Sequence, residues 1–124
     1  YGADQTRSFC YIDDGALGTI DAMECEDAKH DIFHIGNEIE ITIEDLVKEA
    51  GKYFNYSGEY EFAPTYPGSV SRRCPDISKS KRMFNFSPQI SWQEGLMKTL
   101  EWYKNYYIKN GEKRYFEGPY KFYK

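Results

Sequence analysis

Residues 5–14 read QTRSFCYIDD: a basic residue, then a short aromatic and β-branched run that ends in two aspartates. Residues 8–12 have the composition of a β-strand. Asp13 or Asp14 then offers a side-chain oxygen to cap the N-terminus of a helix. The stretch therefore predicts a strand that leads into a helix. It also raises the question of why Arg7 stands at the mouth of the strand.

The helix expected after this stretch is short. Ala16, Ile20 and Met23 fall on one of its faces, with Leu17 beside them. We expect the helix to end near Cys25.

Two further helices have strong local signals. Thr42 with Asp45, and later Ser91 with Glu94, resemble capping boxes, and each pair is followed by apolar residues at helical spacing. These apolar positions are Ile43, Leu46, Val47, Ala50 and Phe54 in the first helix, and Trp92, Leu96, Leu100, Tyr103 and Tyr107 in the second.

The segments between the helices predict strands and a loop. Residues 31–35 form a mostly apolar run that a Gly-Asn pair stops, which is typical of a buried strand ending in a turn. Residues 38–41 and 60–62 alternate between polar and apolar side chains. Residues 64–75 are rich in Pro, Gly and Ser, and predict an irregular loop before a helix near residues 76–84.

Helices that alternate with short strands make the chain α/β, or α+β if it stands as an isolated fragment. The predicted strands are fewer than an autonomous parallel sheet usually has. The length of 124 residues suits one domain, and a hydrophobic content of 40% is enough for a packed core.

The overall charge excludes a general attraction to phosphate polymers. The chain has 16 Lys and Arg against 20 Asp and Glu, for a net charge of -4. Any anion that it binds must therefore be held by a local cluster of basic residues.

The cysteines favour a reducing environment. Cys10, Cys25 and Cys74 are widely spaced and form no C-x-x-C pair, which argues against a disulfide framework and against a zinc site. No stretch approaches the roughly 18 to 20 apolar residues that cross a bilayer. We expect a cytoplasmic protein without a membrane anchor. Because Tyr1 is not a start methionine, we also expect the chain to be cut from a longer one.

Three arginines are candidates for chemistry. Arg7, Arg72 and Arg73 are solvated surface charges in the simpler interpretation. In the alternative interpretation they form a phosphate clamp, since a guanidinium can donate two hydrogen bonds to the oxygens of one phosphate. The arginine pair comes shortly before a predicted helix start, where the helix dipole disfavours cations, so helix stability alone does not explain it.

Other candidates have simpler explanations. His30 and His34 are four apart, but along a strand this spacing is about 13 Å, so a structural or surface role is preferred to a metal site. For the acidic pair that ends the opening stretch, helix capping is preferred to acid/base catalysis. Tyr120 and Lys124 have Y-x-x-x-K spacing, but they follow Gly-Pro at the end of the sequence and are set aside. No G-x-G-x-x-G, P-loop or G-x-S-x-G motif occurs.

Four blocks carry a family resemblance: YGADQTRSFCYIDD, DIFHIGN, EITIEDLVKEA and YPGSVSRRCPDISKSKRMFNFSPQISWQEGLMKTLEWY. In this order they resemble the C-terminal portion of the extended short-chain dehydrogenase/reductases that act on nucleotide sugars. By motif the chain is most similar to UDP-glucuronate decarboxylases and to NAD-dependent epimerase/dehydratases of surface-polysaccharide synthesis. The resemblance covers residues 1–107 and leaves residues 108–124 as a basic, aromatic extension.

The resemblance implies a two-part subunit. An N-terminal Rossmann half binds NAD and carries the catalytic Y-x-x-x-K pair, and a smaller C-terminal half holds the nucleotide diphosphate of the sugar. Carried across, Arg7 and one arginine of the pair, with Arg73 favoured over Arg72, grip the pyrophosphate, and Gln5 lies nearby. Arg7 is then expected at the mouth of the strand for an anionic substrate.

The sequence also departs from the family. Residues 66–68 are Tyr-Pro-Gly where many relatives have Arg-Pro-Gly, which removes one potential phosphate ligand. The Rossmann half is absent, so the chain itself is expected to have no catalytic residue, no NAD-binding residue, no metal site and no oxidoreductase activity. We expect the intact enzyme to act on a UDP- or dTDP-sugar, without nucleic acid, as a homodimer.

A second hypothesis makes the chain a non-catalytic module. The basic aromatic tail would then bind a protein partner or stack on single-stranded nucleic acid, with salt-sensitive affinity. The nucleotide-sugar hypothesis is preferred.

Overall fold

The structure is a computed structural model, in which we describe the backbone of residues 1–110 and the side chains of residues 1–106. The elements are β1 (Thr6–Ser8), α1 (Ile12–Glu24), the short 3₁₀-helix η1 (Glu26–Ala28), β2 (Glu40–Thr42), α2 (Ile43–Tyr53), β3 (Arg72–Arg73), α3 (Ser78–Phe84) and α4 (Trp92–Asn110). The predicted α/β class is confirmed.

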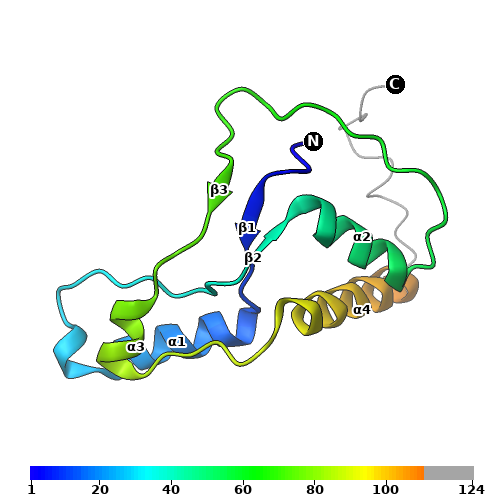
Figure 1. The fold of residues 1–124 in the computed structure, drawn as a ribbon. Coiled ribbons are helices and arrows are strands. Elements are labelled where there is room, and N and C mark those ends of the chain that lie inside the picture. The colour runs from blue at the N-terminus through cyan, green and yellow to red at the C-terminus, as the bar shows by residue number, and fades with distance from the viewer. Residues whose placement is uncertain (111–124) are drawn as a thin grey trace.

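The three strands form one small sheet in the order β2-β1-β3 (Figure 1). The central strand β1 is antiparallel to β2, with Arg7 opposite Ile41. It is parallel to β3, with Arg7 opposite Arg73. Segments far apart in the sequence therefore meet at β1.

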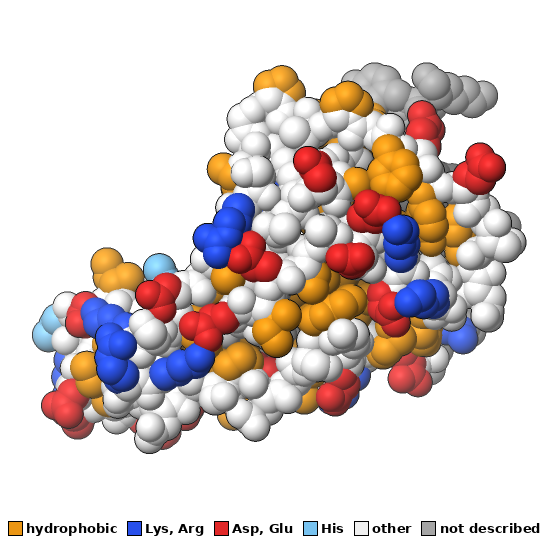
Figure 2. Space-filling model, viewed as in Figure 1, with side chains coloured by type: hydrophobic (Ala, Val, Ile, Leu, Met, Phe, Trp, Pro, Cys, Tyr) orange, Lys and Arg blue, Asp and Glu red, His pale blue; other side chains and the backbone are white. Residues whose placement is uncertain are grey.

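The helices lie in two groups, at opposite ends of the molecule. Helices α1 and α3 pack together at one end, and α2 and α4 at the other (Figure 1). The core between these elements is small: among residues 1–106 the buried hydrophobic residues are Ala28, Ile41, Ile77 and Phe86. Apolar side chains reach the surface at many places on the face in Figure 2.

Local capping signals placed two helices correctly. The backbone N–H of Asp45 donates to Thr42 Oγ1 over 3.0 Å, and the Thr42 hydroxyl donates to the Asp45 carboxylate over 2.7 Å. Likewise the N–H of Glu94 donates to Ser91 Oγ over 3.2 Å at the start of α4. Helices α2 and α4 are confirmed because these signals depend only on residues a few positions apart. The helix predicted near residues 76–84 is confirmed as α3, although its N-cap Ile77 makes no side-chain capping bond.

The predicted start of α1 was wrong. The strand lies at Thr6–Ser8 rather than at residues 8–12, and α1 begins already at Ile12 with Tyr11 as N-cap, which makes no side-chain capping bond. Beyond Ser8, β1 has no paired residue on either neighbouring strand, so the chain turns into the helix early. Neither Asp13 nor Asp14 is the N-cap.

The strands predicted at residues 31–35 and 60–62 are also absent, since both segments lie outside helices and strands. Their apolar side chains have no neighbouring strand, and Ile32 is 80% exposed. The reverse error occurs in the predicted loop at residues 64–75, which contains β3. A two-residue strand carries no pattern of its own, because its partner alone defines it.

Most of the predicted extension at residues 108–124 lies outside the described residues. Helix α4 runs to Asn110, three residues into the predicted extension at 108–124, and residues 111–124 lie outside the described part of the chain. The Tyr120–Lys124 spacing therefore also lies outside it. No helix in the described part is long and apolar enough to span a membrane.

Candidate anion site

The sheet places the predicted arginines on its two faces. In the parallel pairing of β1 with β3, Arg7 stands opposite Arg73 and Thr6 opposite Arg72. Adjacent strands are about 4.8 Å apart, and side chains alternate between faces along each strand. Arg7 and Arg73 therefore share one face of the sheet, and Arg72 projects from the other.

Arg72 is neutralised by a carboxylate. Its guanidinium donates to Glu40 on β2 from Nη2 over 2.6 Å and from Nε over 3.0 Å. Thr6 Oγ1 donates to the same carboxylate over 2.8 Å. The hydrogen bond from Arg72, followed by the one from Thr6, lowers the pKa of Glu40, and Glu40 in turn raises the pKa of Arg72. This arginine is committed to joining β2 and β3 around β1.

Arg7 has only neutral partners. Its Nη1 donates to the carbonyl of Thr6 over 2.7 Å, and its Nη2 donates to the carbonyl of Val70 over 3.0 Å and to Gln5 Oε1 over 2.9 Å. Neither Arg7 nor Arg73 forms a salt bridge within the described residues. Two positive charges on one face of the sheet thus lack a counter-charge there.

Gln5 holds the loop that supports Arg7. Its buried side chain donates to Thr65 Oγ1 over 2.7 Å and to Ser69 Oγ over 3.0 Å. Gly2 makes room for it: φ is +59° at Gly2, and a Cβ there would lie 2.8 Å from Gln5 Cδ. The structure therefore gives Gln5 a positioning role.

An open depression of about 520 Å³ lies beside β3. It is lined by Ser8, His34, Arg72, Arg73, Cys74 and Pro75. Arg7 is not among the lining residues, so a ligand that touches both Arg7 and Arg73 must extend beyond the depression, from β3 towards the central strand β1.

Two lining residues of this depression were not predicted for it. His34 Nδ1 lies 3.2 Å from the carbonyl of Asp76, and Cys74 lies next to the arginine pair. Burial, followed by the charge of Glu40, raises the pKa of the Cys74 thiol, which favours its neutral form. Of these two residues, only Cys74 could have been found from the sequence, because it directly follows the arginine pair.

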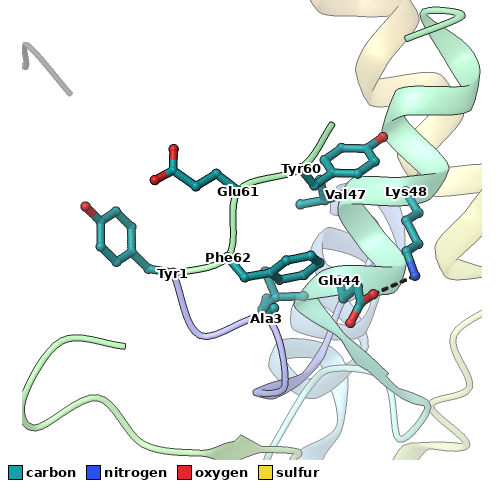
Figure 3. A pocket seen from close by; sticks show the side chains of 9 residues that line it. Tyr1, Ala3, Glu44, Val47, Lys48, Tyr60, Glu61 and Phe62 are labelled. Carbon is teal, nitrogen blue, oxygen red and sulfur yellow. Dashed lines mark ion pairs between the residues drawn. The ribbon is translucent and has the colours of Figure 1, made fainter. Parts of the chain in front are cut away.

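A second hollow of about 100 Å³ lies between α2 and residues 60–62 (Figure 3). Phe62 and Val47 give it apolar walls, and the cation at its rim, Lys48, is paired with Glu44 over 2.5 Å. That pairing raises the pKa of Lys48. The hollow has no unpaired cation and does not suit an anion.

Tyr66, at the position where many relatives have arginine, stacks on Tyr1, with ring centroids 4.8 Å apart. It brings no positive charge to the site.

Asp14, considered as half of an acid/base pair, is buried and accepts hydrogen bonds from the backbone N–H groups of Gln89 and Ile90 over 3.0 and 2.9 Å. Its role is structural. Among the described residues no cluster of His, Cys, Asp and Glu could hold a metal ion.

Comparison with known proteins reveals the relatives of the chain. It is 33% identical to the UDP-N-acetyl-alpha-D-glucosaminuronate decarboxylase of Bacillus cytotoxicus over 81% of this chain and 33% of that protein. The chain is a relative of the UDP-sugar decarboxylases and epimerases. It is also 37% identical to UDP-glucuronic acid decarboxylase 3 of Arabidopsis thaliana over 74% of this chain and 26% of that protein. No family model matches the sequence.

The fold agrees with this relationship to UDP-sugar enzymes. The crystal structure of UDP-glucuronic acid 4-epimerase from Bacillus cereus, in complex with UDP-glucuronic acid and NAD, matches 85% of this chain with a TM-score of 0.78 and 30% identity. The match covers 34% of the epimerase chain. The chain thus spans about a third of the length of such relatives.

Proposed function

We propose that this chain holds the nucleotide diphosphate of a UDP- or dTDP-sugar, as the substrate-binding part of an NAD-dependent nucleotide-sugar epimerase/dehydratase or decarboxylase. The observation that carries the proposal is the adjacent placement of Arg7 and Arg73 without a carboxylate partner. The kinship with UDP-sugar enzymes supports the same assignment.

The surroundings of Arg7 suit a diphosphate. Its terminal nitrogens are held by neutral oxygens, and a charged acceptor makes hydrogen bonds about twice as strong as neutral ones. A phosphoryl oxygen therefore competes well with the carbonyl of Val70 for this guanidinium. Arg73, exposed on the same face, would contact the second phosphoryl group.

We infer that NAD is bound elsewhere in the subunit. The sequence lacks the glycine-rich turn that cradles a dinucleotide, and no strand among residues 1–110 leads into such a turn. We therefore place the cofactor and the catalytic groups in the rest of the subunit. Bound NAD would supply hydride transfer, while the residues described here bind and orient the nucleotide.

We also propose that the intact enzyme works in the cytoplasm as a homodimer. Three cysteines without a disulfide among the described residues and the absence of a spanning helix there support the compartment. Sedimentation of the intact enzyme tests the dimer.

Calorimetric titration of the intact protein with UDP tests the clamp. We expect Arg7→Ala and Arg73→Ala each to weaken binding by roughly 1.5 to 3 kcal/mol, the scale of a hydrogen bond to a charged group. Arg82→Ala is the matched control, because Arg82 is an exposed arginine on α3 outside the depression, and it should bind as the wild type does. Unchanged affinity in both Arg7→Ala and Arg73→Ala rules out the clamp.

A further inference from the structure

Helix α4 carries a group of exposed aromatic side chains in its second half. Trp102 is 58%, Tyr103 46% and Tyr106 41% exposed. The Trp102 ring stacks on Tyr106, with centroids 5.2 Å apart, and meets Tyr103 edge-on at 4.9 Å. We call these three residues the aromatic cluster. Exposed apolar side chains that touch one another mark an interaction surface, whereas single ones need no explanation.

The central residue of the cluster points away from the neighbouring helix. Lys104 Nζ lies 5.8 Å from the centroid of the Tyr53 ring on α2, so this side of α4 faces α2. Positions two residues apart point about 200° apart around a helix axis, which places Trp102 on the side opposite Lys104. The packing of α4 on α2 therefore does not explain Trp102.

The charge of the sequence changes sign at the cluster. Residues 104–124 contain six Lys and Arg against two Asp and Glu, whereas residues 1–103 contain ten against 18. The same end is aromatic, since nine of the 22 aromatic residues lie within residues 102–124. An acidic chain with one basic, aromatic end is typical of a protein that binds a negatively charged partner through that end.

The carboxylates of α2 and α4 leave this charge standing. Three of their glutamates pair with a lysine of the same helix, as Glu44–Lys48, Glu49–Lys52 and Glu94–Lys98. Glu101, beside the cluster, is exposed and forms no salt bridge within the described residues. It reduces the positive charge of residues 104–124 without reversing it. Carboxylates more than about 8 Å away are largely screened at physiological ionic strength.

We propose that this end of the chain, the aromatic cluster with residues 104–124, binds the surface of an anionic membrane. Trp and Tyr side chains favour the boundary of lipid and water, because their rings are apolar and their N–H or O–H groups reach water. Anionic headgroups attract Lys and Arg, and a cluster of about four to eight of them is typical of lipid-binding segments. Such binding is peripheral, so it needs no spanning helix and is compatible with a cytoplasmic enzyme.

Single-stranded nucleic acid fits the cluster less well. Bases bind by stacking on exposed ring faces, along a basic groove that follows the backbone. One face of the Trp102 ring is already stacked on Tyr106. Lys98, one turn before Trp102 on the same side of α4, is paired with Glu94. A lipid surface needs neither a free ring face nor a groove.

Co-sedimentation with vesicles tests the proposal. The intact protein is mixed with vesicles of phosphatidylcholine alone, and with vesicles that also contain about 30% phosphatidylserine as the anionic lipid. We expect binding to the anionic vesicles to be at least about 10-fold tighter, because each Lys or Arg near such a surface strengthens binding about five-fold. High salt should abolish the difference. Equal binding to the two kinds of vesicle, or binding to neither, overturns the proposal.

Two matched charge variants locate the basic contact. Lys113→Ala with Arg114→Ala should weaken binding to the anionic vesicles by about 10- to 30-fold. Lys29→Ala with Arg82→Ala removes the same charge from two exposed residues at the opposite end of the molecule, where α1 and α3 lie (Figure 1). This control should change binding by less than about two-fold. Equal weakening in both variants shows a general attraction and overturns the assignment to this end.

A second pair of variants tests the aromatic contact. Trp102→Ala with Tyr106→Ala should weaken binding to the anionic vesicles by about 10-fold, since two interfacial rings are lost. Trp102→Phe with Tyr106→Phe keeps two rings and should retain most of the binding. Circular dichroism checks that both variants keep their helices. Unchanged binding in the alanine variant overturns the role of the cluster.

A fluorescent oligothymidine distinguishes the alternative partner. An intact protein that binds the oligonucleotide and no vesicles would assign this end to nucleic acid and overturn the proposal. The membrane contact is also separable from the clamp, because Arg7→Ala should bind vesicles as the wild type does. A protein that binds anionic vesicles but not UDP would sustain the membrane contact and reject the proposed function.

Discussion

At the scale of single residues, three arginines of one sequence have three different environments. Arg72 is neutralised by Glu40, Arg7 is held by neutral oxygens, and Arg73 is exposed. The sequence predicts the three as a group. It does not predict which of them is engaged internally, because Glu40 reaches Arg72 only through strand pairing between segments 32 positions apart.

The pair of Glu40 and Arg72 gives the sheet a dependence on pH. Because Arg72 holds the pKa of Glu40 below its usual value of 4.5, the pair stabilises the fold above that pH. The contribution is lost as the pH falls through the lowered pKa and Glu40 takes up a proton. We expect an NMR titration of the Glu40 carboxyl carbon to give a midpoint below 4.5 that moves up in Arg72→Ala. An unmoved midpoint would show that Arg72 does not set this pKa.

At the scale of elements, helices were easier to predict than strands, although the run at residues 38–41 overlaps the observed strand β2 at Glu40–Thr42. The capping boxes at Thr42 and Ser91 act over three residues, so the sequence places α2 and α4 by itself. A strand is defined by its partner. The segment at 31–35 has strand composition but no partner, whereas β3 has a partner but only two residues. Both errors have this single cause.

Asp14 shows an element held by a contact that the sequence does not reveal. Its carboxylate joins α1 to the chain before α4 through the N–H groups of Gln89 and Ile90. We expect Asp14→Ala to speed hydrogen exchange of these two amides by about 10- to 100-fold, as each loses a charged acceptor. Asp13→Ala is the control, because Asp13 is exposed and makes no such bond. Equal exchange in the two variants would contradict the assigned role.

At the scale of the whole molecule, the composition predicts a larger hydrophobic core than the described residues form. The sequence is 40% hydrophobic, yet four hydrophobic residues are buried among those described, and many large apolar side chains, Met23 and Trp102 among them, are exposed. Composition cannot show this, since it counts apolar residues without saying what covers them.

We therefore expect the isolated 124-residue chain to unfold with weak cooperativity. The dependence of its unfolding free energy on urea follows the surface exposed, and should fall below about 1 kcal/mol per M, the lower end for small proteins. Circular dichroism during a urea titration measures this slope. A steep transition, above that value, would show that the chain buries far more surface alone than the structure indicates.

The register of the two short parallel strands has a thermodynamic consequence. Arg7 and Arg73 are adjacent only while β1 and β3 are paired, so the unfolded chain cannot present them together. A nucleotide that needs both arginines binds the folded form alone and shifts the folding equilibrium towards it, by about 2.7 kcal/mol at a hundred times its dissociation constant. We expect UDP to raise the melting temperature of the intact protein, and to raise that of Arg7→Ala less at the same concentration. The supply of substrate in the cell would then govern how much of the protein survives proteolysis, besides how fast it turns over.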